Sequence, residues 1–576
     1  MSASLGANRF GPRLDGDHAT FQLWAPSAKA VAVAIEGQAP VALTQDADGF
    51  WSGAAPARAG DRYRFDVDGR RVPDPASRFQ PDDVSGSSEL IDPEAYVWRH
   101  SDWAGRPWEE TVLYELHAGV LGGFQSVRER LKAIAELGVT ALQLMPIGDF
   151  AGAHNWGYDG VLPFAPARAY GRPDDLRALV DEAHGLGLMV FLDVVYNHFG
   201  PEGNWLPSYA PAFFDEAKHT PWGAAIDFHK PAVRRFFTEN ALYWLEDFRI
   251  DGLRLDAVHQ ILDRSWLVEV AAEVRARLPG RHVHLVVENE NNDARLLTEG
   301  FDAQWNDDFH NVLHVLLTGE TQTYYRDFAN HPARRLARCL AEGFIYQGEP
   351  SPNHDGRPRG EPSADLSPTA FVSFLQNHDQ VGNRALGERL TRLADPAALK
   401  AAMTLMLLCP QIPMLFMGEE VGAREPFLFF TDFHGDLAKA VRKGRRKEFA
   451  GQPGFADETA RAKIPDPNAA STFEASRWTA DAADADDWRA LIARLLEIRR
   501  TRIIPRLKGC RSINAIVLDE KAVQARWRLA DGTTLTIATN LGEASAGADL
   551  PETPPLIGSH PGDAVPPFTT LAWIEP

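Results

Sequence analysis

Cysteine and long apolar runs are both scarce in this sequence of 576 residues. Only three cysteines occur, and their odd number and wide spacing fit neither a disulfide framework nor a metal site: Cys339, Cys409 and Cys510. No apolar run approaches the ~20 residues that cross a membrane. The first residues, MSASLGANRFGPRLDG, lack the apolar core of a signal peptide. We therefore expect a protein of a reducing compartment, the cytoplasm.

Positive charge is also in deficit. The chain has 59 Lys and Arg residues against 79 Asp and Glu residues, which gives a formal net charge of −20. Such an acidic chain is a poor partner for nucleic-acid backbones or anionic membranes, so we expect neither. Its content of 44% hydrophobic and 24% charged residues is typical of globular proteins. Its length predicts two or three domains.

Three zones differ in their hydrophobic pattern. Residues 1–100 contain short apolar runs such as FQLWAP and AVAVAI, separated by turn residues, which predicts an N-terminal β-sandwich. Residues 101–500 alternate strands with helices. Residues 501–576 return to short strands and predict a C-terminal β-sandwich. In the first sandwich we expect three aromatic residues in the core: Phe21, Trp24 and Trp51.

The middle zone belongs to the α/β class. Its strands are apolar on both faces, as strands of a covered parallel sheet are. The eight candidate strands are VLYELH, ALQLMPI, MVFLDVVYNH, IDGLRLD, HVHLVVE, FDAQWN, FVSFLQ and IPMLFMG. Eight such units predict a catalytic (β/α)8 TIM barrel with inserted loops. An open doubly wound sheet is the alternative, but no glycine-rich phosphate turn follows the first strand.

Polar side chains gather at the carboxyl ends of these strands, where a TIM barrel places its active site. They are Asp193, Asn197 and His198 after the third strand, Arg254, Asp256 and His259 on the fourth, Glu288 after the fifth, and His378 and Asp379 after the seventh. A single aspartate at such a place is commonly a helix cap, and metal binding is a rival interpretation. Three carboxylates beside a buried arginine are costly to hold together, which favours a functional site.

Aromatic residues accompany this cluster: Trp156, Tyr158, Tyr196 and Trp205. Aromatic faces stack on sugar rings, while carboxylates accept hydrogen bonds from sugar hydroxyls. Glycoside hydrolysis needs a carboxylate nucleophile and a carboxylic acid that donates a proton. The histidines of the cluster are scattered along the sequence, which gives the metal interpretation no support. The residues therefore favour a glycosidase.

Four motifs resemble, in order and spacing, those of the α-amylase family of retaining glycosidases: DVVYNH, DGLRLDAVH, VVENE and FLQNHD. They cover a barrel-sized stretch. The segment FQLWAPSAKAVAV resembles the N-terminal sandwich of branching enzymes and isoamylases. Other segments resemble the trehalose-releasing branch of the family and extend the resemblance over nearly the full chain, among them QWNDDFHNVLHVLLTGE, FLQNHDQVGNRALGERL and PFLFFTDFHGDLAKAVRKGRRKEF.

The resemblance implies roles for the clustered residues. Asp256 is expected to be the nucleophile and Glu288 the general acid/base. Asp379 is expected to bind sugar hydroxyls and to help keep Glu288 protonated. Arg254 lies two residues before Asp256, on the same side of the strand, and should keep that carboxylate ionised. The expected substrate-binding residues are Trp156, Tyr158, Asp193, His198, Arg254, His259 and His378.

Three further residues are expected to lie outside the catalytic set. Asp251 falls on the other face of its strand and should be structural. Glu290 is a weaker candidate for the acid than Glu288, because the family's acid follows the apolar run directly. Asn197 resembles a calcium ligand of secreted relatives, but we expect neither a metal nor a cofactor here.

The implied reaction is hydrolysis of the α-1,4 bond next to the terminal trehalose of malto-oligosyltrehalose. It should proceed by retaining double displacement, with the two carboxyl groups about 5–5.5 Å apart. Maltodextrins are the related ligands, and a malto-oligosyltrehalose synthase is the expected functional partner. The segments WNDDFHN and QVGNRALGERL are expected to line the pocket of the leaving trehalose. The basic run at residues 442–449 is expected to be a solvated helix face, with a sugar-binding arginine as the alternative.

Two other functions remain open at this point. An α-glucan branching or debranching enzyme, or a general maltodextrin hydrolase, would share the three carboxylates. A catalytically inactive glucan-binding protein would share the fold but lack the nucleophile or the acid. The presence of Asp256, Glu288 and Asp379 disfavours the inactive protein.

Overall fold

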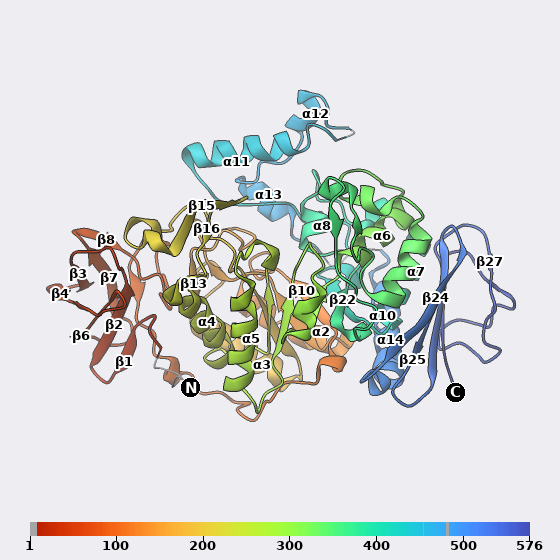
Figure 1. Ribbon diagram of the computed structural model, residues 1–576, viewed down its shortest axis with the longest axis horizontal. Helices are drawn as coiled ribbons and strands as arrows, with labels where there is room; N and C mark the ends of the chain where they lie inside the picture. The colour runs from red at the N-terminus through yellow and green to blue at the C-terminus, as the bar shows by residue number, and fades with distance from the viewer. Residues whose placement is uncertain (1–7, 453, 480–482) are drawn as a thin grey trace.

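The computed structural model of the chain describes residues 8–452, 454–479 and 483–576. Two antiparallel sheets form its N-terminal part, at the left of Figure 1. One sheet has the order β1-β2-β6-β5 (Arg13–Asp15, His18–Trp24, Phe50–Pro56, Thr44–Gln45). The other has the order β4-β3-β7-β8 (Val41–Ala42, Val31–Ile35, Arg62–Val67, Arg70–Val72), with β9 (Ser88–Glu89) beside β7. The predicted core residues Phe21, Trp24 and Trp51 are buried there, as expected.

A closed barrel of eight parallel strands follows. Its order is β10-β11-β14-β17-β18-β19-β22-β23 (Leu113–Leu116, Ala141–Leu144, Met189–Val194, Gly252–Leu255, His284–Val287, Ala303–Trp305, Phe371–Ser373, Ile412–Phe416). Every residue of these strands is buried, because the strands pack against helices outside and against one another inside. All eight predicted strands and the predicted TIM barrel are confirmed.

Helices surround the barrel and join its strands (Figure 1). The longer ones are α3 (Pro173–Gly185), α4 (Pro231–Glu246), α5 (Arg264–Arg277), α6 (Asp307–Thr318), α7 (Pro332–Glu342), α10 (Pro396–Leu408) and α14 (Ala485–Ile498). Within the described residues, no helix is both long and apolar enough to span a bilayer.

Asp251 lies at the amino-terminal end of the barrel, away from the other acids of its motif. Its carboxylate accepts hydrogen bonds from Trp103 Nε1 at 2.8 Å and from the backbone nitrogen of Val190 at 2.9 Å. His184 Nε2 lies 2.9 Å from the same carboxylate. These contacts join the amino-terminal ends of barrel strands to α3 and to the loop that carries Trp103, which agrees with the structural role expected for Asp251.

The C-terminal sheet has the order β24-β25-β26-β29 (Arg511–Asp519, Ala522–Arg528, Thr534–Asn540, Thr569–Glu575), with a smaller pair β27 and β28 (Ala546–Gly547, Ala564–Val565). Its side chains bond directly to barrel helices. Trp527 Nε1 donates to the carbonyl of Leu340 on α7 at 3.2 Å, and Thr570 Oγ1 donates to the carbonyl of Ala401 on α10 at 2.8 Å. The division of the chain near residues 100 and 500 stays a prediction.

A helical insertion between β23 and α14 lies over one end of the barrel (Figure 1). It contains α11 (Gly435–Glu448), α12 (Glu458–Ala462) and α13 (Ala470–Ala475). The basic run falls on α11. Arg442, Lys443 and Lys447 are exposed, as expected of a solvated face, but Arg445 is buried. The prediction is therefore wrong for Arg445, because this side chain turns inward and bonds to backbone carbonyls of another segment.

Candidate active site

One buried guanidinium connects four barrel strands at their carboxyl ends. Arg254 Nη1 lies 2.7 Å from Asp193 Oδ2 and 2.9 Å from Asp256 Oδ1. Its Nη2 lies 3.5 Å from Glu288 Oε2, and its guanidinium carbon lies 4.1 Å from the ring centroid of Trp305. Because Arg254 is fully buried, its charge is stabilised by these partners rather than by water. The structure therefore brings Arg254, Asp256 and Glu288 together, as the sequence predicted.

Asp256 is held by donors at both carboxylate oxygens. Arg254 donates to Oδ1, and Asn197 Nδ2 donates to Oδ2 at 2.8 Å. Acceptance at both oxygens suits an ionised carboxylate. The next residue, Ala257, has a φ of 41°, which turns the chain sharply after the strand. Its backbone nitrogen donates to Glu288 Oε2 at 2.7 Å, so the turn joins the two carboxyl groups expected to react.

Glu288 has the pKa of a proton donor. Burial raises it, and the negative charges of Asp256, Asp307 and Asp379 raise it further, while Arg254 opposes them. The result is a pKa of about 8. A carboxyl group with this pKa is largely protonated at neutral pH, which is the state that a general acid needs.

The third carboxylate is on the short helix α8 (His378–Gly382), capped by Asn377. His378 Nδ1 lies 2.6 Å from Glu115 Oε1, and His378 Nε2 lies 3.5 Å from Asp379 Oδ2. Burial disfavours the imidazolium, but the charges of Asp379 and Glu115 outweigh it and raise the pKa of His378 to about 9. His378 is therefore a cationic donor at neutral pH.

Tyr158 lies between two of these groups. Its hydroxyl donates to Asp193 Oδ2 at 2.7 Å and lies 2.8 Å from His378 Nε2. Its ring stacks on the His378 ring with centroids 5.1 Å apart. Burial raises the pKa of Asp193 to about 6 against the opposing charge of Arg254. Asp193, Tyr158 and His378 thus form one polar wall beside Asp256.

The other predicted substrate-binding residues lie around this wall. His198 stacks on Trp222, with centroids 4.2 Å apart, and burial lowers its pKa. His259 lies at the rim, 3.8 Å from Glu290. Trp156 is buried with its ring nearly perpendicular to that of His378, with centroids 5.6 Å apart, so it packs against that residue.

Two aromatic residues that we expected at the site lie elsewhere. Tyr196 is buried between α4 and α5, where its hydroxyl donates to Asn240 Oδ1 at 2.7 Å. Trp205 Nε1 donates to Ser85 Oγ at 3.3 Å, on the loop from the N-terminal sheets. Both follow the third strand in sequence, but the loop carries them away from the barrel axis.

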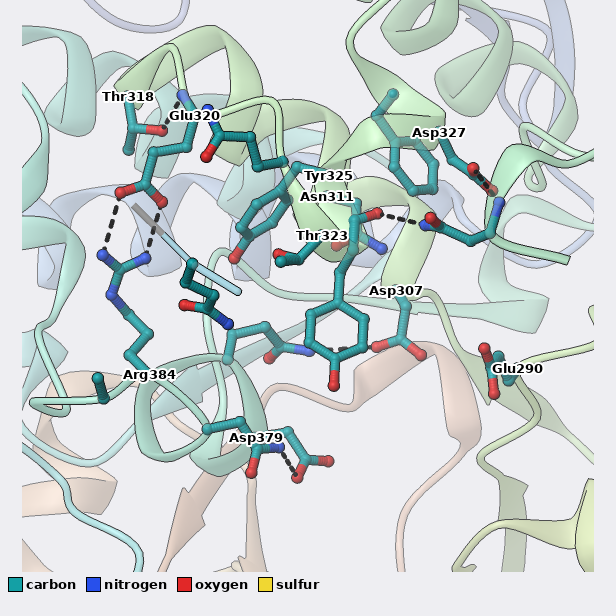
Figure 2. A pocket seen from close by; sticks show the side chains of 18 of the residues that line it. Glu290, Asp307, Asn311, Thr318, Glu320, Thr323, Tyr325, Asp327, Asp379 and Arg384 are labelled. Carbon is teal, nitrogen blue, oxygen red and sulfur yellow. Dashed lines mark hydrogen bonds and ion pairs between the residues drawn. The ribbon is translucent and has the colours of Figure 1, made fainter. Parts of the chain in front are cut away.

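A cavity of about 650 Å³ opens beside Glu288. Its lining includes residues from both segments predicted to contact the leaving sugar: Asp307 and Asn311 from the first, and Gln380, Asn383 and Arg384 from the second. Figure 2 shows Asp307 and Asp379 facing this space from different sides.

The far wall of the cavity is an ion-paired network that the sequence did not reveal. Arg384 pairs with Glu320 through two hydrogen bonds of 2.8 and 3.0 Å. His314 Nε2 lies 2.8 Å from the same Glu320, and its ring stacks on Tyr325 with centroids 3.9 Å apart. The wall therefore presents fixed polar groups and an aromatic ring to a polar ligand.

Two acids of the site were also missed. Glu115 stands in the apolar run VLYELH, and a buried acid in such a run was the available signal. Asp307 precedes Asp308 in WNDDFHN, and nothing in the pattern says which of the two faces the cavity. Within the described residues, no group of three or more His, Cys, Asp or Glu side chains has the geometry to hold a metal ion.

Comparisons with known proteins agree with this geometry. The family model "Alpha amylase, catalytic domain" matches residues 77–222, and "Domain of unknown function (DUF3459)" matches residues 510–568. The malto-oligosyltrehalose trehalohydrolase of Deinococcus radiodurans is 42% identical over 479 residues, 81% of this chain and 78% of that protein. The enzyme of the same name from Rhizobium sp. (strain M-11) is 37% identical over 95% of this chain and 94% of that protein.

A solved structure matches the whole arrangement. The crystal structure of a putative α-amylase from Salmonella typhimurium superposes with a TM-score of 0.93 at 42% identity. The match covers 99% of this chain and 100% of that one. The barrel and both flanking sheet regions are therefore shared.

Proposed function

This chain belongs to the malto-oligosyltrehalose trehalohydrolases of the α-amylase family, and from that premise we propose that it hydrolyses the α-1,4 bond next to a terminal trehalose unit. The products are trehalose and a malto-oligosaccharide. The observation that carries the proposal is the cavity beside Glu288, lined by segments that follow β19 and β22.

The proposed mechanism is a retaining double displacement. Asp256 attacks the anomeric carbon, the glycosidic bond breaks, and Glu288 gives its proton to the departing trehalose oxygen. A water molecule then loses a proton to Glu288, attacks the same carbon and releases Asp256. The support is that both carboxyl groups contact Arg254 and that the pKa of Glu288 is strongly raised. Their separation of about 5–5.5 Å stays a prediction.

Asp379 and the polar wall are proposed to hold the reacting glucose. Cationic His378 supplies a donor, Tyr158 supplies its aromatic face, and Asp193 and Asp379 supply acceptors. His198, with a ring nitrogen that has no partner among the described residues, is proposed to donate to the same sugar. His259 and Glu290 lie farther out, at the rim.

Trehalose would leave from the cavity on the Glu288 side. Its two rings are joined through both anomeric carbons, so it bends differently from maltose. A pocket shaped for trehalose rejects maltose through misfit and unpaired polar groups. We expect this discrimination to amount to about 10–10³ in kcat/KM.

Product analysis tests the proposal. Maltotriosyltrehalose should give trehalose and maltotriose, and proton NMR of the first product should show the α-anomer. Maltopentaose should be the poorer substrate. Equal rates would reduce the enzyme to a general maltodextrin hydrolase, new α-1,6 linkages from amylose would make it a branching enzyme, and an initial β-anomer would contradict retention.

Two further features belong to the same proposal. We place the enzyme in the cytoplasm, paired in function with a malto-oligosyltrehalose synthase that would supply its substrate. We also place catalysis in residues 101–500, between sandwiches at 1–100 and 501–576. The three carboxylates argue against an inactive glucan-binding protein.

A further inference from the structure

Arg445 differs from the other basic residues of α11. Its side chain is only 7% exposed, whereas that of Arg442 on the same helix is 44% exposed. Arg445 Nη2 donates to the carbonyl of Gly382 at 2.7 Å and to the carbonyl of Arg384 at 2.9 Å. Its Nη1 donates to Glu448 Oε2 at 3.0 Å. A buried guanidinium requires such partners, so α11 is fixed to the segment that contains these two carbonyls.

That segment is the end of α8, the helix that carries the third carboxylate. The helix has only five residues, too few to be stable by itself. Asn383, just after it, donates from Nδ2 to Asp379 Oδ1 at 3.1 Å. The residue that follows α8 therefore helps to hold the Asp379 side chain in place.

Trp156 and Arg445 both contact the end of α8. A Cβ atom placed on Gly382 would lie 2.1 Å from the Trp156 indole, so this glycine packs flat against the ring. Arg445 donates a hydrogen bond to the carbonyl of Gly382, which would otherwise have no donor because it lies at the end of a short helix. Packing and hydrogen bonding together leave α8 little freedom.

The same contact reaches the far wall of the cavity. Arg445 bonds to the backbone of Arg384, whose side chain pairs with Glu320. The guanidinium carbon of Arg445 also lies 4.7 Å from the ring centroid of Phe449, which is buried and lines the cavity. One side chain thus joins the insertion, the wall and the catalytic helix.

We propose that Arg445 is a positioning residue, through which α11 fixes Asp379 for catalysis and Arg384 for recognition of the leaving sugar. It touches no reacting atom. The second part rests on the proposed function, because it takes the cavity as the site of the leaving trehalose. The first part requires only that Asp379 acts in the reaction.

The experiment compares Arg445→Ala and Arg445→Lys with Arg442→Ala in the full-length protein. Arg442 is the matched control, since it is an arginine of the same helix with one exposed ion pair, to Asp466. For each variant, kcat/KM would be measured on maltotriosyltrehalose and on maltopentaose across pH, together with the thermal unfolding temperature.

Arg445→Ala should lose about 10²-fold in kcat/KM, the cost of a displaced catalytic group. The alkaline limb of its pH profile of kcat/KM should move to lower pH, because a displaced Asp379 would raise the pKa of Glu288 less strongly. Its preference for maltotriosyltrehalose should also fall. Arg445→Lys keeps the charge but not the paired donors and should lose less. Arg442→Ala should match the wild type.

The proposal is overturned if Arg445→Ala keeps kcat/KM, pH profile and preference within about twofold, or if Arg442→Ala shows the same losses. If Arg445→Ala does not fold, Arg445→Lys is judged by the same three criteria. Its expected loss in kcat/KM is smaller, about tenfold. A wild type without preference between the two sugars would contradict the proposed function instead. The ratio of variant to wild type on either sugar still tests the positioning of Asp379.

Discussion

Replacing Asp307 with asparagine should shift the alkaline limb of the pH profile of kcat/KM to lower pH. Asp307 lines the cavity with Glu288 and accepts a hydrogen bond from Gln380 Nε2 at 3.3 Å. Asparagine keeps the shape and still offers that acceptor, but it removes a negative charge. Since this charge is one cause of the raised pKa of Glu288, its removal should make Glu288 a stronger acid.

The size of the expected change in kcat/KM follows from the pKa of about 8 for Glu288, which sets its protonated fraction at each pH. A fall of about one unit, or ~1.4 kcal/mol, would leave the acid almost fully protonated at roughly pH 6 in both proteins. At about pH 8.5 the protonated fraction would drop by a factor of about eight. The loss should therefore be small on the acidic side of neutrality and large above it.

The assay is kcat/KM for maltotriosyltrehalose between about pH 5 and pH 9.5, which reports the groups of the free enzyme. Glu290→Gln is the matched control, because it removes a charge from the rim of the same cavity, where the side chain is 58% exposed and screened by water. The reasoning is refuted if Asp307→Asn leaves the alkaline limb in place, or if Glu290→Gln moves it equally.

Three further changes test other parts of the structure. Asp256→Asn should lower kcat by several orders of magnitude with the fold retained, as circular dichroism would check; near-normal turnover would exclude Asp256 as the nucleophile. Glu288→Gln should abolish activity yet raise the unfolding temperature at pH 8, and hardly change it at pH 4.5. The reason is that folding raises the pKa of this carboxyl group from 4.5 to about 8, so the wild-type protein loses about 1.4 kcal/mol of stability per pH unit between these values. Equal unfolding temperatures of variant and wild type at pH 8 would contradict this. Trp24→Ala should cost about 3–5 kcal/mol in urea unfolding without changing KM, and a raised KM at unchanged stability would make the N-terminal sheets a sugar-binding module.

The barrel could be predicted because its strands are encoded locally. Each of the eight strands is a short apolar run bounded by turns, and closure makes their ends meet. Polar residues within such a run or just after it were therefore placed correctly, as Arg254 and Asp256 were. Asp251, which the same alternation separated from them, lies away from both at the amino-terminal end of the barrel.

The errors lie in loops, where alternation stops. Tyr196 and Trp205 follow the third strand closely, yet packing against α4 and the N-terminal sheets turns both away. Arg445 has the neighbours of an exposed helix face, and only the partner segment, far away in the sequence, makes it buried. The direction of such side chains depends on tertiary contacts that no local pattern contains.

The bonds between the C-terminal sheet and the barrel bear on how this protein can be shortened or recombined. Trp527 of β25 is buried against α7, and Thr570 of β29 donates to the carbonyl of Ala401 on α10. The sheet thus supplies hydrogen-bond donors and apolar cover that the barrel helices lack by themselves. A chain cut near residue 500 would expose these two helices, so we expect it to be less stable than the full chain, and the C-terminal sheet to be a poor choice for transfer to another barrel.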